Sequence, residues 1–174
     1  DRHWKITKAE VYDYVFNGAP ATKDIKEWPG NGDITFGEDY FLAPYIKRDT
    51  LDSTGYDPNK GDYPNYNFSG KYPGNICNDF VFGDQTLWWV INDVGNTHGE
   101  TGGDQIGLEI RCQAFGFKTN DEINNMTFYK YQIINRSNQS VNNTYFGVWV
   151  DPDLGKATDD YVGCDVTLGL GYVY

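Results

Sequence analysis

The sequence contains no apolar run that approaches the about 18–20 residues of a membrane-spanning helix. Its first ten residues, DRHWKITKAE, also lack the apolar stretch that characterises a signal peptide. We therefore expect no insertion into a membrane by this region of the protein.

Basic residues are few. The chain has 14 Lys and Arg against 25 Asp and Glu, which gives a net charge of −11 and an isoelectric point of about 4.4. Binding to nucleic acid needs a basic surface that neutralises phosphates, so this class of partner is excluded. The acidic balance favours binding of cations and solubility outside the cell.

Cysteine and histidine are also scarce, with three and two residues. Cys77, Cys112 and Cys164 form no CxxC pair, so a zinc site of known spacing is not expected. Two arrangements of the cysteines remain open: one disulfide with one free thiol, or three buried thiols. Cys112 lies in an alternating strand pattern and is interpreted as a small core residue.

No GxSxG, HExxH or P-loop motif occurs in the chain. Hydrolysis of glycosides needs only two carboxylates, so composition does not exclude it. Pairs drawn from Asp151, Asp153 and Glu109 are not distinguishable from ordinary surface acids. We therefore expect a protein that is not an enzyme, with no catalytic residues.

Ala, Leu and Glu are scarce, whereas Gly is abundant at 20 residues and aromatic residues make up 17% of the chain. This mixture disfavours a helical bundle and favours strands, turns and ordered loops. At 174 residues, the chain is long enough for one domain with its own core.

One helix is expected near the N-terminus, in TKAEVYDYVFNG. Thr7 and Glu10 have the spacing of a capping box, and Gly18 stands where helices commonly end. The apolar residues on one face predict packing against a sheet; they are Val11, Tyr14 and Val15.

The segment 21–83 is irregular but rich in aromatic residues, which pin long loops to a protein body by burying their rings. We expect ordered coil here, with turns at PGNGD and NKGDYPN. The rings concerned are Trp28, Tyr40, Phe41, Tyr45, Tyr56, Tyr63, Tyr66 and Tyr72.

From residue 84 onward the pattern predicts five strands: TLWWVIN, QIGLEIRCQAFGF, MTFYKYQIIN, TYFGVWV and VTLGLGYVY. The second strand alternates apolar and polar residues, as a half-buried antiparallel strand does. In TYFGVWV both faces are apolar, which predicts a central strand covered on both sides and joined to the third strand through RSNQSVNN. Core packing is the expected role of Trp88, Trp89 and Trp149.

These elements predict a mostly β fold, an antiparallel β-sandwich of jelly-roll type with a short N-terminal helix and long ordered loops. We expect a single domain over residues 1–174, with a helical segment at 1–20, the loop-rich segment at 21–83 and the strands at 84–174. The apolar run LGLGYVY at the end predicts a chain that is a fragment of a longer protein.

Negative charge is concentrated in WVDPDLGKATDDYVGCD, after the expected central strand. Calcium takes six to eight oxygen ligands from carboxylates, carbonyls and waters, and a loop of this kind supplies them. The alternatives are aspartates that cap turns and backbone amides, and a catalytic carboxylate pair. The candidate calcium ligands are Asp151, Asp153, Asp159, Asp160 and Asp165.

A second, weaker calcium candidate is formed by Asp57, Asn59 and Asp62. Their spacing partly resembles an EF-hand loop, but no glutamate follows at its last position, so only a looser calcium turn or a plain Asx-turn remains. The segment NDVGNTHGETGGD has two interpretations, a transition-metal site and a wide turn between two strands. The polar residues of that loop are Asp93, His98, Glu100 and Asp104.

The chain resembles a region of large secreted proteins of Bacteroidota that are exported by the type IX secretion system. The resemblance covers about residues 28–174 and is carried by GDQTLWWVINDVGNTHGETGGDQIGLEIRCQAFGF, by YKYQIINRS with TYFG, and most specifically by DPDLG with DDYVGCD. It implies a location outside the cell or on its surface, and no activity.

The sequence therefore predicts a non-catalytic extracellular structural or adhesion module of a type IX-secreted protein, stabilised by calcium. Its partners would be other domains of the same parent protein, surface proteins or the secretion machinery. Two alternatives remain open: a module that binds or degrades glycans, which would present exposed aromatic side chains, and a secretion cargo bound to its export machinery.

Overall fold

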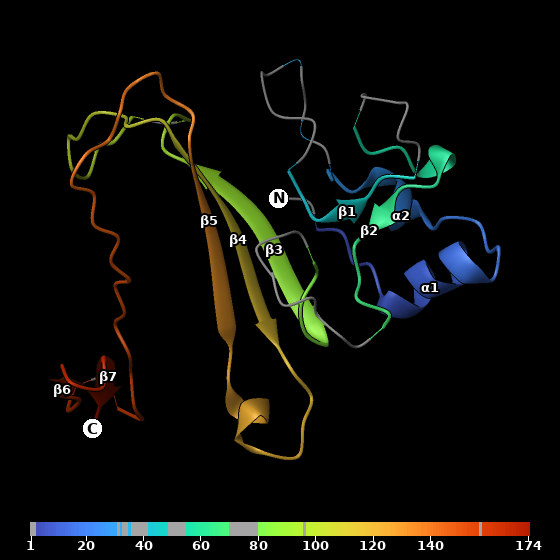
Figure 1. The fold of residues 1–174 in the computed structure, drawn as a ribbon. Coiled ribbons are helices and arrows are strands. Elements are labelled where there is room, and N and C mark those ends of the chain that lie inside the picture. Colours follow the sequence, from blue (N-terminus) through green and yellow to red (C-terminus); the bar gives the residue numbers. More distant parts are fainter. Residues whose placement is uncertain are drawn as a thin grey trace. The chain divides into compact units, whose positions relative to one another are not determined.

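The computed structural model describes residues 3–30, 32, 35, 42–48, 55–69, 80–95, 97–156 and 158–174 (Figure 1). The chain divides into two compact units, residues 1–138 and 139–174, and each is described by itself. Antiparallel strands dominate the described residues and the helices are short. The β-rich class predicted from the sequence is confirmed, whereas the sandwich and the single domain stay predictions.

The expected N-terminal helix is present as α1, Lys8–Phe16. The Thr7 hydroxyl oxygen accepts a hydrogen bond from the Glu10 N–H at 3.2 Å, and the Glu10 carboxylate accepts one from the Thr7 N–H at 2.7 Å. This reciprocal pair is the predicted capping box. Gly18 follows the helix with a φ of 71°, which ends it as expected. Val11 is fully buried.

A second helix, α2 at Lys23–Glu27, was not predicted. The Thr22 hydroxyl oxygen accepts a hydrogen bond from the Ile25 N–H at 3.4 Å and so caps its first turn. Five residues are too few for a helical period to show in a sequence. The helix places Ile25 in the core with no exposed surface.

Aromatic rings hold the described parts of the loop-rich segment together. The two-stranded antiparallel sheet of β1 (Tyr45–Ile46) and β2 (Tyr63–Pro64) lies here, together with the 3-10 helix η2 (Pro58–Lys60). The Tyr56 ring meets those of Trp28 and Tyr45 edge-on, with centroids 5.4 and 5.3 Å away. Tyr56 also donates its hydroxyl to the Ile25 carbonyl. Tyr40, Phe41 and Tyr72 lie outside the described residues.

Helix α1 contacts β2, as the prediction of packing against a sheet requires. The hydroxyl of Tyr14 donates to the Pro58 carbonyl, and that of Tyr66 donates to the Ile6 carbonyl at 2.8 Å. Two tyrosines thus join residues about 44 and 60 positions apart in the chain. Burial of these phenols raises the pKa of Tyr14 and of Tyr66.

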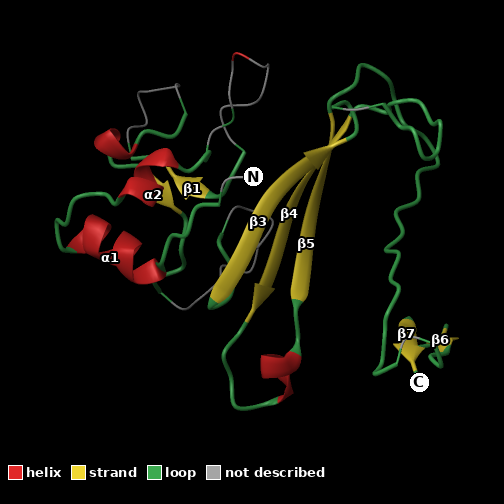
Figure 2. Ribbon diagram, turned by 180° about the vertical axis from the view of Figure 1, so that it is seen from behind, coloured by secondary structure: helices red, strands yellow, loops and turns green. Residues whose placement is uncertain are grey.

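The main sheet has three antiparallel strands in the order β3–β4–β5 (Figure 2). They are β3 (Gln85–Asn92), β4 (Leu108–Gly116) and β5 (Phe128–Asn135). The register places Trp89 opposite Cys112, and Cys112 opposite Tyr131. Strands β4 and β5 are joined through the 3-10 helix η3, Glu122–Asn125. The first three predicted strands of the 84–174 segment are confirmed.

The unit 139–174 contains a small antiparallel hairpin of β6 (Val162–Asp165) and β7 (Leu170–Val173). The sequence predicted one strand over VTLGLGYVY, but residues 166–169 form the turn of this hairpin and only the end of that run is a strand. Gly169, with a φ of 62°, belongs to this turn.

The predicted central strand TYFGVWV is wrong. Residues 144–150 form no strand, and the expected hairpin through RSNQSVNN is not formed either. Tyr145 is 93% exposed and Trp149 is 82% exposed, so Trp149 is not a core residue. A run of apolar and aromatic residues indicates that a segment suits a strand, but a strand forms only where a neighbour accepts its backbone hydrogen bonds.

Candidate functional site

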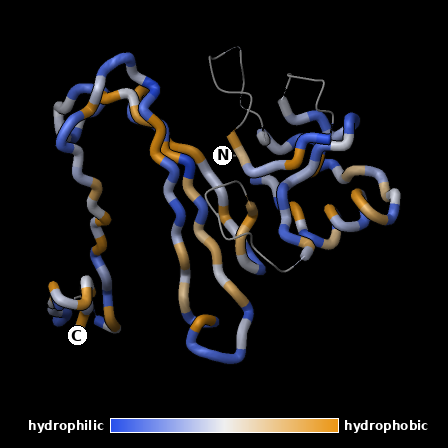
Figure 3. The backbone as a smooth tube through the Cα atoms, viewed as in Figure 1, coloured by the Kyte–Doolittle hydropathy of each residue, from blue (hydrophilic) through white to orange (hydrophobic). Residues whose placement is uncertain are grey.

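The β3–β5 sheet has two chemically different faces, which follow from the alternation of side chains along paired strands. One face, here called the apolar face, carries no charged residue at any strand position. Figure 3 shows hydrophobic stretches within this sheet. The residues of the apolar face are Leu87, Trp89, Ile91, Leu108, Ile110, Cys112, Ala114, Tyr129, Tyr131 and Ile133.

Much of the apolar face is open to solvent in the unit to which it belongs. Cys112 and Ala114 in the central strand are buried, but Leu87 is 62% exposed and Tyr129 and Tyr131 are 58% and 48% exposed. The two tyrosine rings are almost parallel, with 5° between their planes and 6.3 Å between centroids. The exposed apolar side chains thus lie on β3 and β5, on either side of the buried central residues Cys112 and Ala114.

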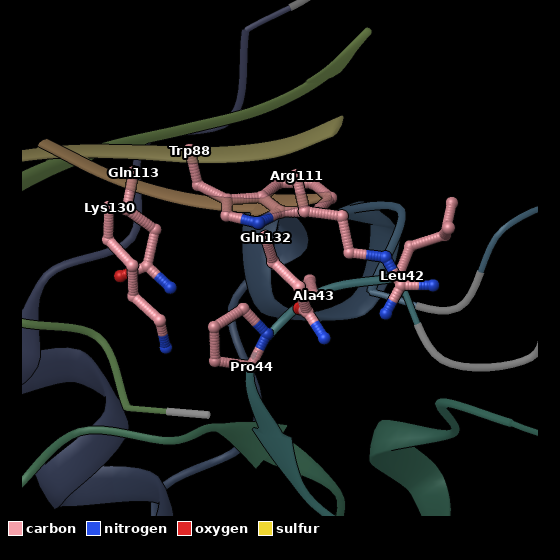
Figure 4. Close-up of a pocket in the computed structure, with 8 residues that line it drawn as sticks. All are labelled: Leu42, Ala43, Pro44, Trp88, Arg111, Gln113, Lys130 and Gln132. Carbon is pink, nitrogen blue, oxygen red and sulfur yellow. The ribbon is translucent and has the colours of Figure 1, made fainter. Parts of the chain in front are cut away.

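The opposite face, here called the mixed face, is partly covered by the 42–44 segment. Trp88 on this face also meets the Trp28 ring edge-on, at 6.4 Å between centroids. Figure 4 shows side chains of the sheet directed toward Pro44. Between them lies a cavity of about 10 Å³, which is room for one water. It is lined by Leu42, Ala43, Pro44, Trp88, Arg111, Gln113, Lys130 and Gln132.

One carboxylate and two guanidinium groups form ion pairs at the mixed face. The Glu109 carboxylate accepts hydrogen bonds from the guanidinium groups of Arg111 at 2.8 Å and Arg136 at 3.1 Å. Desolvation raises the pKa of Glu109, but the two arginines outweigh it, so the net pKa lies below the usual value. The buried Gln113 Oε1 atom lacks a partner among the described residues, and one water in the cavity would satisfy it.

A larger hollow, of about 490 Å³, opens where the apolar face ends. Leu87 and Ala114 belong to both the hollow and the face, and Met126, which follows η3, lines it from the side. Asp84 lies at this hollow, but its carboxylate accepts the Lys118 N–H at 2.8 Å and so stabilises a turn. The hollow therefore extends the apolar face and offers no acid–base pair.

The loop between β3 and β4 is organised around Asp93. Its carboxylate accepts the backbone N–H groups of Ile106, Gly107 and Leu108 at 2.5–3.1 Å. Desolvation raises the pKa of the Asp93 carboxyl group, but these hydrogen bonds lower the pKa by more. The net pKa therefore lies below the usual value. The two ring nitrogens of His98 face the carbonyl oxygens of Asp93 and Gly103 at 2.9 and 3.0 Å. The wide-turn interpretation of this loop accounts for both residues.

In the acidic segment, two of the five candidate aspartates bind backbone amides. The Asp160 carboxylate accepts the Leu154 N–H at 2.9 Å. Asp165, in strand β6, accepts the N–H groups of Thr167 and Leu168 at 2.9 and 3.0 Å and so caps the hairpin turn. These two residues follow the capping alternative. Asp151, Asp153 and Asp159 form no side-chain hydrogen bond with described residues.

The second candidate site is also built from capped turns. The Asp57 carboxylate accepts the Asn59 N–H at 2.9 Å at the start of η2. Asp62 is 1% exposed, and its carboxylate accepts the N–H groups of Arg48 and Asp57 at 2.8 and 2.9 Å. Gly61, with a φ of 98°, completes the turn. The Asx-turn alternative therefore accounts for Asp57 and Asp62.

Within the described ranges, no three His, Cys, Asp or Glu side chains are placed together to hold a metal ion. Of the cysteines, Cys112 is buried and Cys164 exposed, both as free thiols, and Cys77 lies outside the described residues. Burial raises the pKa of the Cys112 thiol, as expected of a core residue.

Comparison of the chain with protein families, with curated proteins and with solved structures found no match. None of the helices in the described part of the chain is long and apolar enough to cross a membrane.

The exposed pair Tyr129 and Tyr131 was not singled out from the sequence. The signal that could have identified it is the MTFYKYQIIN strand itself, in which both tyrosines alternate with polar residues and share a face with Ile133. For the loop segment the sequence predicted buried aromatic rings. Of those, Tyr45 and Tyr56 are 6% and 8% exposed.

Proposed function

We propose that the chain is a non-catalytic extracellular or cell-surface module with a structural or adhesive role. The observation that carries this proposal is the apolar face, an uncharged surface on an otherwise acidic chain. Such surfaces serve association with other molecules or layers of protein. The acidic composition and the resemblance to type IX-secreted proteins support the location.

The non-catalytic part of the proposal is supported by how the described acids are used. Glu109 pairs with two arginines, and Asp93, Asp62 and Asp165 accept backbone amides. A general acid or base needs a carboxyl group that faces a substrate site. These groups are held in structural roles instead.

A glycan-binding module is the second candidate function, and the nearly parallel exposed rings of Tyr129 and Tyr131 favour it. Sugar rings stack on such aromatic faces. Against it, the apolar face has no charged side chain, and glycan recognition also needs polar groups that bind sugar hydroxyls.

Retention on insoluble polysaccharides distinguishes the two functions. Under the structural proposal, the chain stays in solution when mixed with neutral and acidic polysaccharide particles, as a sedimentation assay measures. Retention that is lost on Tyr129→Ala with Tyr131→Ala, and kept on Tyr12→Ala with Tyr145→Ala, would contradict the structural proposal and support the glycan function. The control pair is also exposed but lies outside the sheet.

Calcium stabilisation remains part of the proposal for Asp151 and Asp153, whose carboxylates are not engaged by described residues. A weak extracellular site at millimolar calcium adds about 1 kcal/mol by mass action, or roughly 2–4 °C in melting temperature. We therefore expect chelation to lower the melting temperature by this amount, measured by differential scanning fluorimetry. Asp151→Ala with Asp153→Ala should abolish the difference.

The matched control is Glu100→Ala with Asp104→Ala, which removes the same charge from another exposed loop. This control should keep the response to calcium. Melting curves that coincide with and without chelator would refute calcium binding, and loss of the response in the control would refute its assignment to Asp151 and Asp153.

A further inference from the structure

His98 lies in the loop between β3 and β4, and both nitrogens of its ring have a partner. The Nε2 atom lies 2.9 Å from the carbonyl oxygen of Asp93, and the Nδ1 atom lies 3.0 Å from the carbonyl oxygen of Gly103. Asp93 directly follows β3, whereas Gly103 belongs to the part of the loop that returns to β4. The ring therefore bridges the two halves of the loop.

The chemistry of the two partners selects one protonation state of this ring. A carbonyl oxygen accepts hydrogen bonds and cannot donate them, so each ring nitrogen must carry a proton to bind its partner. Neutral imidazole has one N–H group and one nitrogen lone pair, whereas imidazolium has two N–H groups. Only the imidazolium form of His98 therefore makes both hydrogen bonds. In the neutral form, one nitrogen lone pair faces a carbonyl oxygen at the same short distance.

We propose that His98 is a pH-sensitive clamp that holds the two halves of the β3–β4 loop together in its imidazolium form and weakens in its neutral form. The direction of the effect follows from the hydrogen bonds. The clamp is complete at pH values below the titration of His98, and it loses one hydrogen bond as the pH rises through that titration. This inference is independent of the proposed function, because it rests on the loop and not on the apolar face.

The charged groups around the loop leave this titration to His98. The Asp93 carboxylate accepts three backbone N–H groups and has a pKa below the usual value, so it stays ionised between about pH 5 and 8. Glu100 and Asp104 are the other acids of the loop, and within the described ranges no ion pair joins either of them to His98. The backbone of Arg136 also binds this loop, but its guanidinium is held in an ion pair at the mixed face.

Hydrogen exchange of the full chain, followed by NMR between about pH 5 and 8, tests the clamp. The reporter is the Gly102 N–H, which donates to the His98 carbonyl oxygen at 2.8 Å. We expect its protection factor, which is corrected for the intrinsic pH dependence of exchange, to fall about fivefold as the ring is deprotonated, because one hydrogen bond is lost. Nitrogen chemical shifts of the ring report its charge in the same samples. The control reporter is the Met126 N–H after η3, which donates to the Ile123 carbonyl oxygen at 3.0 Å and should not change.

Two histidine variants separate the clamp from other sources of pH dependence. His98→Gln should remove the fall in protection, because a carboxamide does not titrate, whereas His3→Gln, at the other histidine of the chain, should retain it. Protection of Gly102 that is absent or constant over this pH range would overturn the clamp, as would a fall that persists in His98→Gln. If His98→Gln does not fold, the original chain still decides the question: the fall in protection must coincide with the titration of the His98 ring, and a fall at any other pH contradicts the proposal.

Discussion

Replacing Ile25 by alanine should lower the free energy of unfolding by about 2–5 kcal/mol. Ile25 has no exposed surface, and its carbonyl accepts the Tyr56 hydroxyl. Truncation of this fully buried side chain leaves a cavity that the close-packed surroundings fill only in part. Denaturant unfolding followed by tryptophan fluorescence measures the loss, because Trp28 reports on this cluster.

The matched control is Ile123→Ala. Ile123 is 39% exposed in η3, so the same change should cost less than about 1 kcal/mol. If Ile25→Ala destabilised the chain no more than Ile123→Ala, the α2 helix would not be part of a packed core.

Gly83→Ala should also destabilise the chain strongly, with an expected loss of about 2–4 kcal/mol. Gly83 has a φ of 73°, and a Cβ atom built on it would lie 2.4 Å from the carbonyl oxygen of Gly116. That oxygen accepts the Asp84 N–H at 2.9 Å where β3 begins beside the end of β4. The added methyl group must therefore displace a backbone hydrogen bond at the end of the main sheet.

Gly18→Ala separates the two causes of this loss, which are the left-handed backbone conformation and the contact with the Gly116 carbonyl oxygen. Gly18 has almost the same φ, 71°, but no atom lies within 4 Å of a Cβ built there. It should cost about 1 kcal/mol, the strain of a left-handed alanine alone. Denaturation midpoints of both variants give the comparison, and equal losses would show that the contact with Gly116 does not matter.

The elements predicted correctly are those that local chemistry determines. The capping box of Thr7 and Glu10 lies within four residues, and the alternation of QIGLEIRCQAFGF is visible in one strand. The turn interpretations of Asp57 and Asp93 were also available, because aspartate binds nearby backbone amides.

The features that the sequence did not reveal depend on contacts between residues that are far apart in the chain. The TYFGVWV segment has the composition of a strand, but composition does not specify which strand would pair with it. The alternation in β4 identified a face that suits burial, but not that Leu87 and Tyr129 on it are exposed while Arg111 and Gln113 on the other face are buried. Burial of the polar pair results from long-range contact with the 42–44 segment, which no local pattern encodes.

The order of the strands in the main sheet has a consequence for the folding pathway. Strands β3, β4 and β5 follow one another in the chain and pair with their sequence neighbours, so each pairing closes only a short loop. The bonds that tie Tyr66 to Ile6 and Tyr14 to Pro58 close loops of 60 and 44 residues and carry a larger entropic cost. We expect the β3–β4–β5 sheet to form early and the N-terminal segment to pack onto the rest of its unit later. Both faces of the early sheet are then exposed, and we expect such an intermediate to be prone to aggregation.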